Sequence, residues 1–537
     1  MRRVFAILLA GILLNPGMIG AVPQHHGSGD TATPIKHLVI IFQENVSFDH
    51  YFGTYPNALN LAGENPFHGK SDTPTINGFS PALLTNNPNL NPANGTAATN
   101  PFRLAPAQAA TNDQDHNYTP EQEAYDGGLM DLFPKFTGTS GPPPGTPPIA
   151  DTKGLVMGYY DGNTVTALWN YAQHFAMSDN SFDTNFGPST PGALNVVSGQ
   201  TNGVIDNTNG SGAITADGNG GFSDTGDADP AGDVCSTTTG ETFSMSGQNV
   251  GDLLNAKGIS WGFFSGGFNL SIVNANGSSG CARSTTSTIT LSKKADYIPH
   301  HQPFQYYAST ANPTHVRPAS IAEIGHSGPA NHQYDVQDFF AAVSAGNFPA
   351  VSYLKAPGFQ DGHAGYSDPI DEQTFIVNTI NFLEKSPEWR STAVIIAYDD
   401  SDGWYDHVTS PLVNQSATAS DQNSAGAYMC GSVASATATS LPGVTAAHAQ
   451  ARCGYGPRQP FLVISPYARK NFVDHSITDQ SSVVRFIEDN WLAGERITGS
   501  FDAVAGSISG MFDFDRCRDE DGVLILDPST GERIDRH

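Results

Sequence analysis

The chain has 537 residues, which is enough to bury a large core in one domain or in several. Its 52 acidic residues against 25 lysines and arginines give a formal net charge of -27. This charge excludes a general binder of nucleic acid or of anionic membranes, and an anionic substrate would need local positive charge from a metal ion or from some of the 17 histidines.

The N-terminus has the pattern of an export signal. Arg2 and Arg3 precede a mostly apolar stretch, residues 4–19, and small residues follow up to Ala21. The stretch is short for a membrane span, and a proline interrupts it. We expect residues 1–21 to be a signal peptide, of the general or the twin-arginine type. The mature chain is then exported to the periplasm or the medium, without a transmembrane anchor.

Short apolar runs alternate with amphipathic segments along the rest of the chain. Runs that are apolar almost throughout indicate strands buried on both faces, as in a parallel sheet, and the alternation with helices predicts an α/β core. Strands are expected at residues 37–42, 259–265, 350–354, 393–398 and 461–465, and helices at residues 164–174, 371–383 and 482–491.

Three polar stretches separate these elements. Residues 77–112 are rich in Asn, Pro and Ala, residues 202–241 in Gly, Asp, Ser and Thr, and residues 416–451 in Ala, Ser and Thr. We expect them to be surface insertions or lids within one domain, residues 34–510, rather than linkers between domains. The charged residues 511–537 are expected to form a peripheral C-terminal tail.

Acidic residues follow two of the expected strands directly. The first strand runs into Glu44 and Asn45, and the strand at 393–398 runs into Asp399 and Asp400. Ligands of α/β sheets bind beyond the carboxyl ends of parallel strands, so three carboxylates and one amide would meet there. Such a cluster needs a cation, and oxygen ligands suit Ca²⁺, Mg²⁺ or Mn²⁺. Taken singly, each acid could instead cap a strand end in solvent.

A serine stands in the Gly- and Pro-rich segment FGPSTPG, residues 186–192, just before the apolar run ALNVV. Ser or Thr near a proline is a common helix cap, which is the structural alternative for Ser189. The same position also suits catalysis. A helix N-terminus offers free N–H groups to a phosphate, and a nearby metal would lower the pKa of the serine.

Histidines in irregular segments are candidates for donors to phosphoryl oxygens or to a leaving group. His300 and His301 are adjacent, His363 follows a strand, and His116 precedes a turn. At about pH 5 to 6 we expect the imidazoles beside a phosphoryl group to be cationic while the carboxylates stay ionised. The alternative is that each is an ordinary surface or core histidine.

Five cysteines remain in the exported chain. Cys430 and Cys453 flank a polar loop, and Cys235 and Cys281 flank another irregular stretch, so we expect these two disulfides, with Cys517 left over. Partly free, buried thiols are the alternative. The chain has no CxxC pair, which argues against a cysteine zinc site.

Five segments resemble motifs of the bacterial phosphoesterase family. That family holds non-haemolytic phospholipases C and periplasmic acid phosphatases, and is related to the alkaline phosphatase superfamily. The segments lie between residues 35 and 495 and are 41–56 (IFQENVSFDHYFGTYP), 185–199 (NFGPSTPGALNVVSG), 397–408 (AYDDSDGWYDHV), 458–468 (RQPFLVISPYA) and 481–491 (SSVVRFIEDNW).

The resemblance implies an αβα sandwich with a mainly parallel central sheet, as in alkaline phosphatase, and a phosphoenzyme mechanism. Asp406 and His407 would orient the metal ligands or only shape their loop. By motif match, the nucleophile would be Ser189, the ligands of one divalent metal Glu44, Asn45, Asp399 and Asp400, and the residues around the phosphoryl group His116, His300, His301 and His363.

Differences within the motifs place the chain nearer the acid phosphatases. The phospholipases typically carry Thr in place of Ser189 and Asp-Glu in place of Asp399 and Asp400. They often carry Arg near Gly192, a difference that we expect to reshape the leaving-group pocket. The resemblance thus implies hydrolysis of phosphate monoesters through a phosphoserine. The alternatives are a phospholipase C-type phosphodiesterase and a non-catalytic exported binding protein. The expected partners are phosphorylated small molecules or phospholipid headgroups.

Overall fold

The structure is a computed structural model. It describes residues 31–143, 152–206, 212–218, 220–424, 426–431, 433–434, 451–515 and 522–534. The expected signal peptide and Cys517 lie outside the described residues, as does half of the third insertion, residues 416–451.

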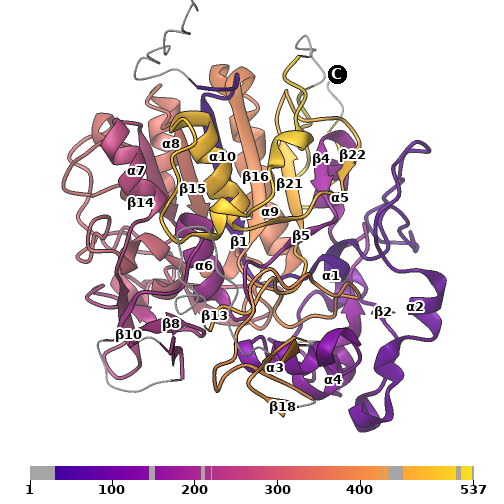
Figure 1. Ribbon diagram of the computed structural model, residues 1–537. Helices are drawn as coiled ribbons and strands as arrows, with labels where there is room; N and C mark the ends of the chain where they lie inside the picture. The colour runs from indigo at the N-terminus through magenta and orange to yellow at the C-terminus, as the bar shows by residue number, and fades with distance from the viewer. Residues whose placement is uncertain are drawn as a thin grey trace, which may run out of the picture.

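An eight-stranded sheet forms the middle of the molecule (Figure 1). Seven of its strands run in the same direction, and only β21 is antiparallel to its neighbours. In order across the sheet the strands are β14 (Gln333–Asp335), β11 (Trp261–Ser265), β15 (Val351–Lys355), β1 (His37–Gln43), β16 (Thr392–Tyr398), β21 (Phe461–Ile464), β4 (Ala176–Ser178) and β22 (Phe472–Asp474).

All five strands expected from the sequence belong to this sheet, within two residues at each end. Their side chains are buried on both faces, as the apolar runs predicted. The direction of β21 corrects the expectation of a parallel strand, because an apolar run of four residues carries no signal of direction. The strands that the sequence did not reveal, β14, β4 and β22, have three residues each, too few to show a pattern.

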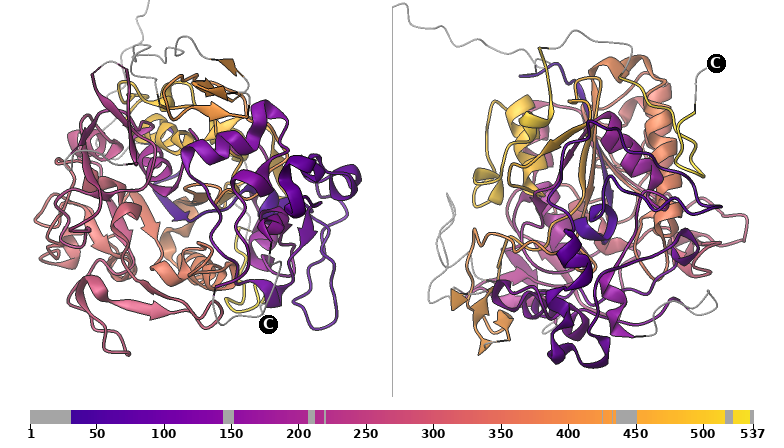
Figure 2. Two further views of the ribbon diagram at one scale, coloured as in Figure 1. Left: turned by 90° about the horizontal axis from the view of Figure 1, so that it is seen from below. Right: turned by 90° about the vertical axis from the view of Figure 1, so that its right-hand side faces the viewer.

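Helices cover both faces of the sheet, which makes the expected three-layer sandwich (Figure 2, right). On one face α6, α7 and α10 contact one another, and on the other α5 contacts α9. The helices are α1 (Phe48–Phe52), α2 (Pro81–Thr85), α3 (Tyr118–Tyr125), α4 (Phe133–Phe136), α5 (Thr166–His174), α6 (Ser189–Ser198), α7 (Val250–Lys257), α8 (Val336–Ser344), α9 (Pro369–Leu383) and α10 (Ser481–Trp491).

The three expected helices are present, and α9 begins two residues earlier than the apolar pattern indicated. The side chain of Asp368 accepts hydrogen bonds from the N–H groups of Ile370 and Asp371, and Pro369 is the first helical residue. An Asp cap followed by Pro is a strong start signal, because proline lacks an N–H that would need a partner there.

Outside the central sheet the strands are short. The three polar insertions hold no described element longer than six residues, and both expected disulfides, Cys235–Cys281 and Cys430–Cys453, are present. These strands are β2 (Phe102–Arg103), β3 (Gly158–Tyr159), β5 (Ser181–Phe182), β6 (Val204–Asp206), β7 (Ile214–Ala216), β8 (Phe222–Asp224), β9 (Asp229–Pro230), β10 (Thr242–Met245), β12 (Ser284–Thr286), β13 (Lys293–Ala295), β17 (Gln422–Asn423), β18 (Gly426–Ala427), β19 (Met429–Cys430), β20 (Val433–Ala434) and β23 (Thr478–Asp479).

The described part of the C-terminal segment packs on α9 and is not merely peripheral. Leu524 and Leu526 are buried, and Leu526 exchanges two backbone hydrogen bonds with the side chain of Asn381. The expected tail therefore contributes to the core, because two leucines among its charged residues pack into the apolar core. No helix in the described residues is long and apolar enough to cross a membrane.

Candidate active site

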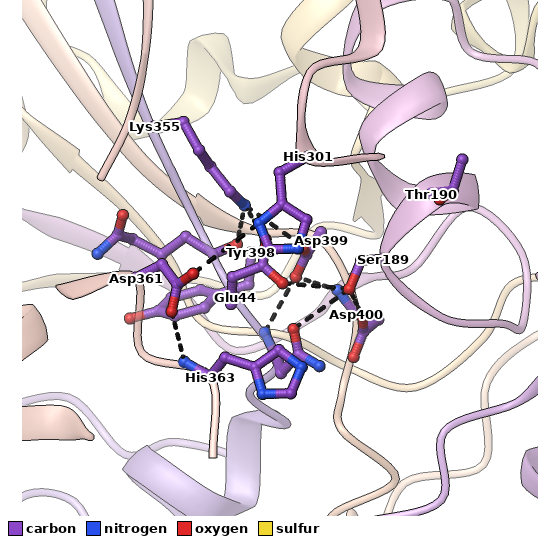
Figure 3. A network of polar contacts seen from close by, with 12 residues as sticks. Glu44, Ser189, Thr190, His301, Lys355, Asp361, His363, Tyr398, Asp399 and Asp400 are labelled. Atoms are coloured by element: carbon purple, nitrogen blue, oxygen red, sulfur yellow. Dashed lines mark hydrogen bonds and ion pairs between the residues drawn. The ribbon is translucent and has the colours of Figure 1, made fainter. Parts of the chain in front are cut away.

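Three neighbouring strands of the sheet, β15, β1 and β16, end at the same edge. In the parallel pairing of β1 with β16, Gln43 lies opposite Tyr398, so Glu44 and Asp399 leave the sheet side by side. Lys355 is the last residue of β15. The strand ends thus bring charged side chains together at one place, as the sequence predicted (Figure 3).

Ser189 is the first residue of α6 and points into this acidic cluster (Figure 3). Its Oγ lies 3.1 Å from Glu44 Oε2, 3.0 Å from Asp400 Oδ2 and 3.5 Å from Asn45 Oδ1. One hydroxyl proton faces three acceptor oxygens, so at most one of these contacts is a hydrogen bond at a time. The arrangement fits a cation that the three oxygens and Ser189 would share.

The ionisation of these carboxylates also favours a bound cation. Burial raises the pKa of Asp400 to about 7, and the charge of Glu44 adds to the rise although His116 opposes it. Two acids crowded in a buried site are stabilised by a divalent ion, and the all-oxygen donor set is that of Ca²⁺, Mg²⁺ or Mn²⁺. The residues present therefore fit the expected metal, and Glu44, Asn45 and Asp400 are the candidates to hold it.

Asp399, the fourth expected ligand, has its oxygens engaged elsewhere. Its Oδ1 accepts hydrogen bonds from the backbone N–H groups of Asn45, at 3.0 Å, and Asp400, at 2.9 Å. Its Oδ2 lies 3.4 Å from Lys355 Nζ. Asn45 has a left-handed backbone, φ 59°, and the hydrogen bond that its N–H donates to Asp399 holds it in that conformation. Asp399 thus shapes the loop of the ligands, and its own coordination stays a prediction.

Lys355 is a site residue that the sequence reasoning missed. Its ammonium contacts Glu44 Oε1, and the side chain is only 1% exposed. Burial opposes its charge, but Asp399 and Glu44 keep the pKa of Lys355 above its ordinary value. A signal was available, because Lys355 follows an apolar run as directly as Glu44 and Asp399 do.

The four candidate histidines gather around the same cluster. His301 Nδ1 lies 3.0 Å from Glu44 Oε1, and the ring of His300 is 4.5 Å from that of His301. His116 Nε2 lies 3.3 Å from Asn45 Nδ2, and the ring of His363 is 6.1 Å from that of His116. The structure thus brings together the histidines that the motif match assigned.

The surroundings of the four histidines divide them into two kinds. Burial lowers the pKa of any imidazole, yet Asp400 and Asp402 raise the pKa of His116, and Asp227 and Asp229 raise that of His300. In the structure His300 Nδ1 lies 3.3 Å from Asp229 Oδ1.

His301 and His363 are of the second kind. Burial is the largest influence on both rings and lowers the pKa of each below its ordinary value. A neutral His301 with its proton on Nδ1 donates to Glu44 and so helps to hold that carboxylate ionised. His363 Nδ1 lies 2.6 Å from the carbonyl oxygen of Ala364, which suits a neutral ring with its proton on that nitrogen.

A buried glutamate behind the nucleophile was not foreseen either. Glu121 accepts hydrogen bonds from the N–H of Gly187, at 3.0 Å, and from the hydroxyl of Ser401, at 2.6 Å. It therefore links the nucleophile segment to the loop after Asp400. Burial raises the pKa of Glu121 to about 8. No local pattern marks such a residue, because its partners come from distant parts of the chain.

Asp406, His407 and Gly192, which the motifs also singled out, make contacts that shape the surroundings of the site. Asp406 pairs with Arg458 at 3.0 Å, and His407 Nδ1 lies 2.6 Å from Asp49 Oδ2, so they shape their loop and do not contact the metal ligands. Gly192 faces the backbone of Asp399, where a Cβ would come within 1.8 Å of the carbonyl oxygen. Gly192 thus allows close packing of α6, and its effect on the leaving-group pocket stays a prediction.

Other donor groups of the site also lie close enough to hold a metal. The ligand atoms of Glu44, His301 and Asp361 lie within 4.8 Å of one another, and so do those of Asp113, His116 and His363. Imidazole nitrogen in the donor set would extend the choice of metals beyond the hard ions.

Comparison with known proteins identifies the family. The model of the phosphoesterase family matches residues 35–493, a range that includes every expected site residue. The chain belongs to the phosphoesterase family, a family of phosphoric ester hydrolases. The family suggested by the sequence motifs is thereby confirmed.

Two curated relatives illustrate the similarity of this phosphoesterase to phospholipases. It is 24% identical to the non-hemolytic phospholipase C of Pseudomonas aeruginosa, over 99% of this chain and 66% of that protein. It is also 24% identical to phospholipase C B of Mycobacterium tuberculosis, over 90% of this chain and 78% of that protein. The chain therefore spans about two thirds of the length of the Pseudomonas protein.

Two solved structures resemble this phosphoesterase more distantly. A protein of the alkaline phosphatase superfamily from Vibrio parahaemolyticus is 13% identical, over 81% of this chain and 75% of its own, with a TM-score of 0.27. Murine ectonucleotide pyrophosphatase/phosphodiesterase 5 is 12% identical, over 65% of this chain and 95% of its own, with a TM-score of 0.30. Likeness at this level adds nothing to the fold described above.

Proposed function

We propose that this phosphoesterase hydrolyses phosphate esters by attack of Ser189 on phosphorus. The observation that carries the proposal is the position of Ser189 Oγ at the start of α6, within 3.5 Å of Glu44, Asn45 and Asp400 oxygens. A helix N-terminus favours an anion, and a nucleophile beside a cation site is suited to a phosphoryl group.

The reaction then has two displacements. In the first, the bond from Ser189 Oγ to phosphorus forms and the bond to the leaving oxygen breaks. In the second, water attacks the phosphoserine, phosphate leaves and the serine hydroxyl is restored. A divalent ion bound by Glu44, Asn45 and Asp400 would neutralise phosphoryl charge and favour the ionised serine.

The chain's own side chains have defined tasks in these steps. Before attack, either Glu44 or Asp400 accepts the single proton of Ser189, since an oxygen of each lies within 3.1 Å of Ser189 Oγ. His300 and His116, whose carboxylate neighbours favour the cation, donate to phosphoryl oxygens or give a proton to the leaving oxygen. His301 and Lys355 hold Glu44 in place.

Two substrate classes are consistent with this chemistry. Ser189 and the Asp399–Asp400 pair favour phosphate monoesters, as in an acid phosphatase. The relatives from Pseudomonas and Mycobacterium are named phospholipases C, which favours a phosphodiester with a lipid or other alcohol. An exported binding protein without activity is disfavoured by the assembled nucleophile and the family. We also propose export, on the pattern of residues 1–21.

The test compares variants of two serines of α6. Rates are measured on p-nitrophenyl phosphate and p-nitrophenyl phosphorylcholine, with the metal content of each preparation determined. Ser189→Ala should lose at least about 10³-fold in kcat on the better substrate. Ser198→Ala, at the far end of α6, should stay within about threefold, because Ser198 bonds only to neighbouring main chain and to Tyr307. A Ser189→Ala enzyme with a tenth of the wild-type rate would refute the assignment.

A further inference from the structure

An acidic residue of the second insertion caps the nucleophile helix. Asp227, on the loop between β8 and β9, is 37 residues from Thr190 along the chain. Its Oδ1 accepts hydrogen bonds from the N–H of Thr190, at 2.9 Å, and from the hydroxyl of Thr190, at 3.0 Å. The cap residue of α6, Pro188, offers no side-chain cap of its own. Asp227 thus supplies from a distant segment the anion that this helix N-terminus favours.

The carboxylate of Asp227 stands close to the reacting oxygen. Four covalent bonds separate Ser189 Oγ from the nitrogen of Thr190, so these atoms lie within about 5 Å. The Asp227 oxygen is therefore within about 8 Å of Ser189 Oγ, given its hydrogen bond to that nitrogen. Thr190, whose N–H and hydroxyl bind Asp227, points away from Glu44 and Asp400 (Figure 3).

The charge of Asp227 is only weakly compensated. Asp227 is exposed, and within the described ranges neither a lysine nor an arginine forms an ion pair with it. The ring of His300, whose Nδ1 lies 3.3 Å from Asp229 Oδ1, interacts electrostatically with Asp227. Asp227 and the proposed ligand Asp400 also influence each other electrostatically. The negative charge of Asp227 is therefore close to the position that the negatively charged phosphate of a substrate must occupy.

Substrates differ in how strongly this charge repels them. The phosphate of a monoester carries two negative charges above about pH 7, because its second pKa is near 6, whereas a diester carries one. An additional charge at about 8 Å from a carboxylate costs roughly tenfold in rate, once solvent screening of the exposed group is allowed for.

We propose that Asp227 is a specificity-determining residue that favours phosphates with one negative charge over phosphates with two. This inference rests on the proposed function, since it concerns the same Ser189 site. It assigns to the second insertion a part in substrate choice: the loop between β8 and β9 holds a carboxylate at the nucleophile through Thr190. On this proposal phosphate monoesters and phosphodiesters are distinguished by their charge and not by the size of the leaving group.

The test uses two esters with the same leaving group, p-nitrophenyl phosphate and methyl p-nitrophenyl phosphate, at pH 8 and low salt. The Asp227→Asn variant keeps an oxygen that can accept from Thr190 but removes the charge. It should raise the ratio of kcat/KM for the monoester to that for the diester by about tenfold, and inhibition by inorganic phosphate should tighten in parallel. In 1 M salt the difference should shrink, because charges are screened within about 3 Å.

Asp229→Asn is the matched control. Asp229 is the first residue of β9, directly after the same loop, and also faces His300, but its other oxygen accepts from the N–H of Thr237 and not from Thr190. The Asp229→Asn variant also removes one negative charge, and it changes the pKa of His300. It should therefore alter the rates on both esters together and shift the ratio of the two rates by less than about threefold.

The possible results distinguish a failure of the Asp227 role from a failure of the proposed hydrolase function. Equal changes on both esters in Asp227→Asn, or an equal shift of the ratio in Asp229→Asn, would overturn the role of Asp227 and leave the proposed function standing. Wild-type enzyme that hydrolyses neither ester would overturn both.

Discussion

Lys355 sets the charge balance of the site. Its buried ammonium contacts Glu44 and lies 3.4 Å from Asp399 Oδ2. Two carboxylates that approach this closely in a buried place repel each other, and a positive charge between them offsets the repulsion. A divalent ion on the other side of Glu44 would then meet a carboxylate already fixed in position.

The Lys355→Met variant tests this balance, since methionine keeps most of the volume but not the charge. Loss of one partner leaves buried carboxylates unpaired, so the free energy of unfolding in urea should fall by about 3 kcal/mol. Lys257→Met removes a half-exposed lysine that pairs with Glu495 at 3.1 Å, and should cost less than about 1 kcal/mol. Equal stabilities of the two variants would show that the Lys355 charge does not support the site.

His300 gives the activity a pH dependence of definite sign. Burial opposes its charge, but Asp227 and Asp229 prevail and raise its pKa above the ordinary value. The ring is therefore cationic at low pH and loses its proton as the pH rises through the raised pKa. We expect kcat/KM for a monoester to fall on that alkaline limb, and His300→Asn to abolish the limb and lower the plateau. An unchanged profile in this variant would mean that the His300 cation plays no part.

At the scale of elements, the site depends on how closely α6 approaches the end of β16. Gly192 is the residue of α6 that faces β16, and a Cβ there would lie 1.8 Å from the carbonyl oxygen of Asp399 and 2.8 Å from the side-chain nitrogen of Gln480. Because the first obstacle is backbone, a side chain at position 192 must push the helix away.

The Gly192→Ala variant should therefore separate Ser189 from Asp400 without unfolding the protein. Displacement of a nucleophile by about 1 Å costs on the order of 10²-fold in kcat. The control is Gly212→Ala, where a Cβ meets nothing within 4 Å and the activity should not change. Full activity in Gly192→Ala would show that α6 can shift without harm to the site.

The elements that carry the site could be predicted from the sequence because they are long and strongly patterned. β1 and β16 have seven residues each, most of them apolar, and Glu44 and Asp399 directly after them placed the acidic cluster correctly. β4 and β22 have three residues each and were invisible to such reasoning, and the direction of β21 has no local signal. Pairing of this kind is decided by tertiary packing.

At the scale of the whole molecule, two disulfides fasten the irregular segments. Cys430–Cys453 spans 23 residues, and Cys235–Cys281 spans 46. Both pairs match those expected from the sequence, although α7 and β11 lie between Cys235 and Cys281. The placement of Glu121 and Asp227 beside Ser189 could not be foreseen, because it results from contacts across 66 residues, to Gly187, and 37 residues, to Thr190.

Reduction of the disulfides should lower the melting temperature. Closure of a loop of this length by Cys430–Cys453 stabilises the fold by about 3 kcal/mol in the chain-entropy model. Calorimetry with and without a reductant measures the change, and mass spectrometry of unreduced peptides confirms the pairing. Free thiols at Cys430 and Cys453 in the native protein would remove the basis of this prediction.

The central claim is that Ser189 carries the phosphoryl group between the two displacements. Enzyme mixed with a phosphate ester and quenched in acid within milliseconds should contain phosphoserine, and peptide mapping measures the position of that group directly. We predict one phosphoryl group on the peptide that contains Ser189, and none when Ser189→Ala is treated in the same way. Rapid turnover with no phosphorylated peptide at any quench time, or with the label on another residue, would contradict the account.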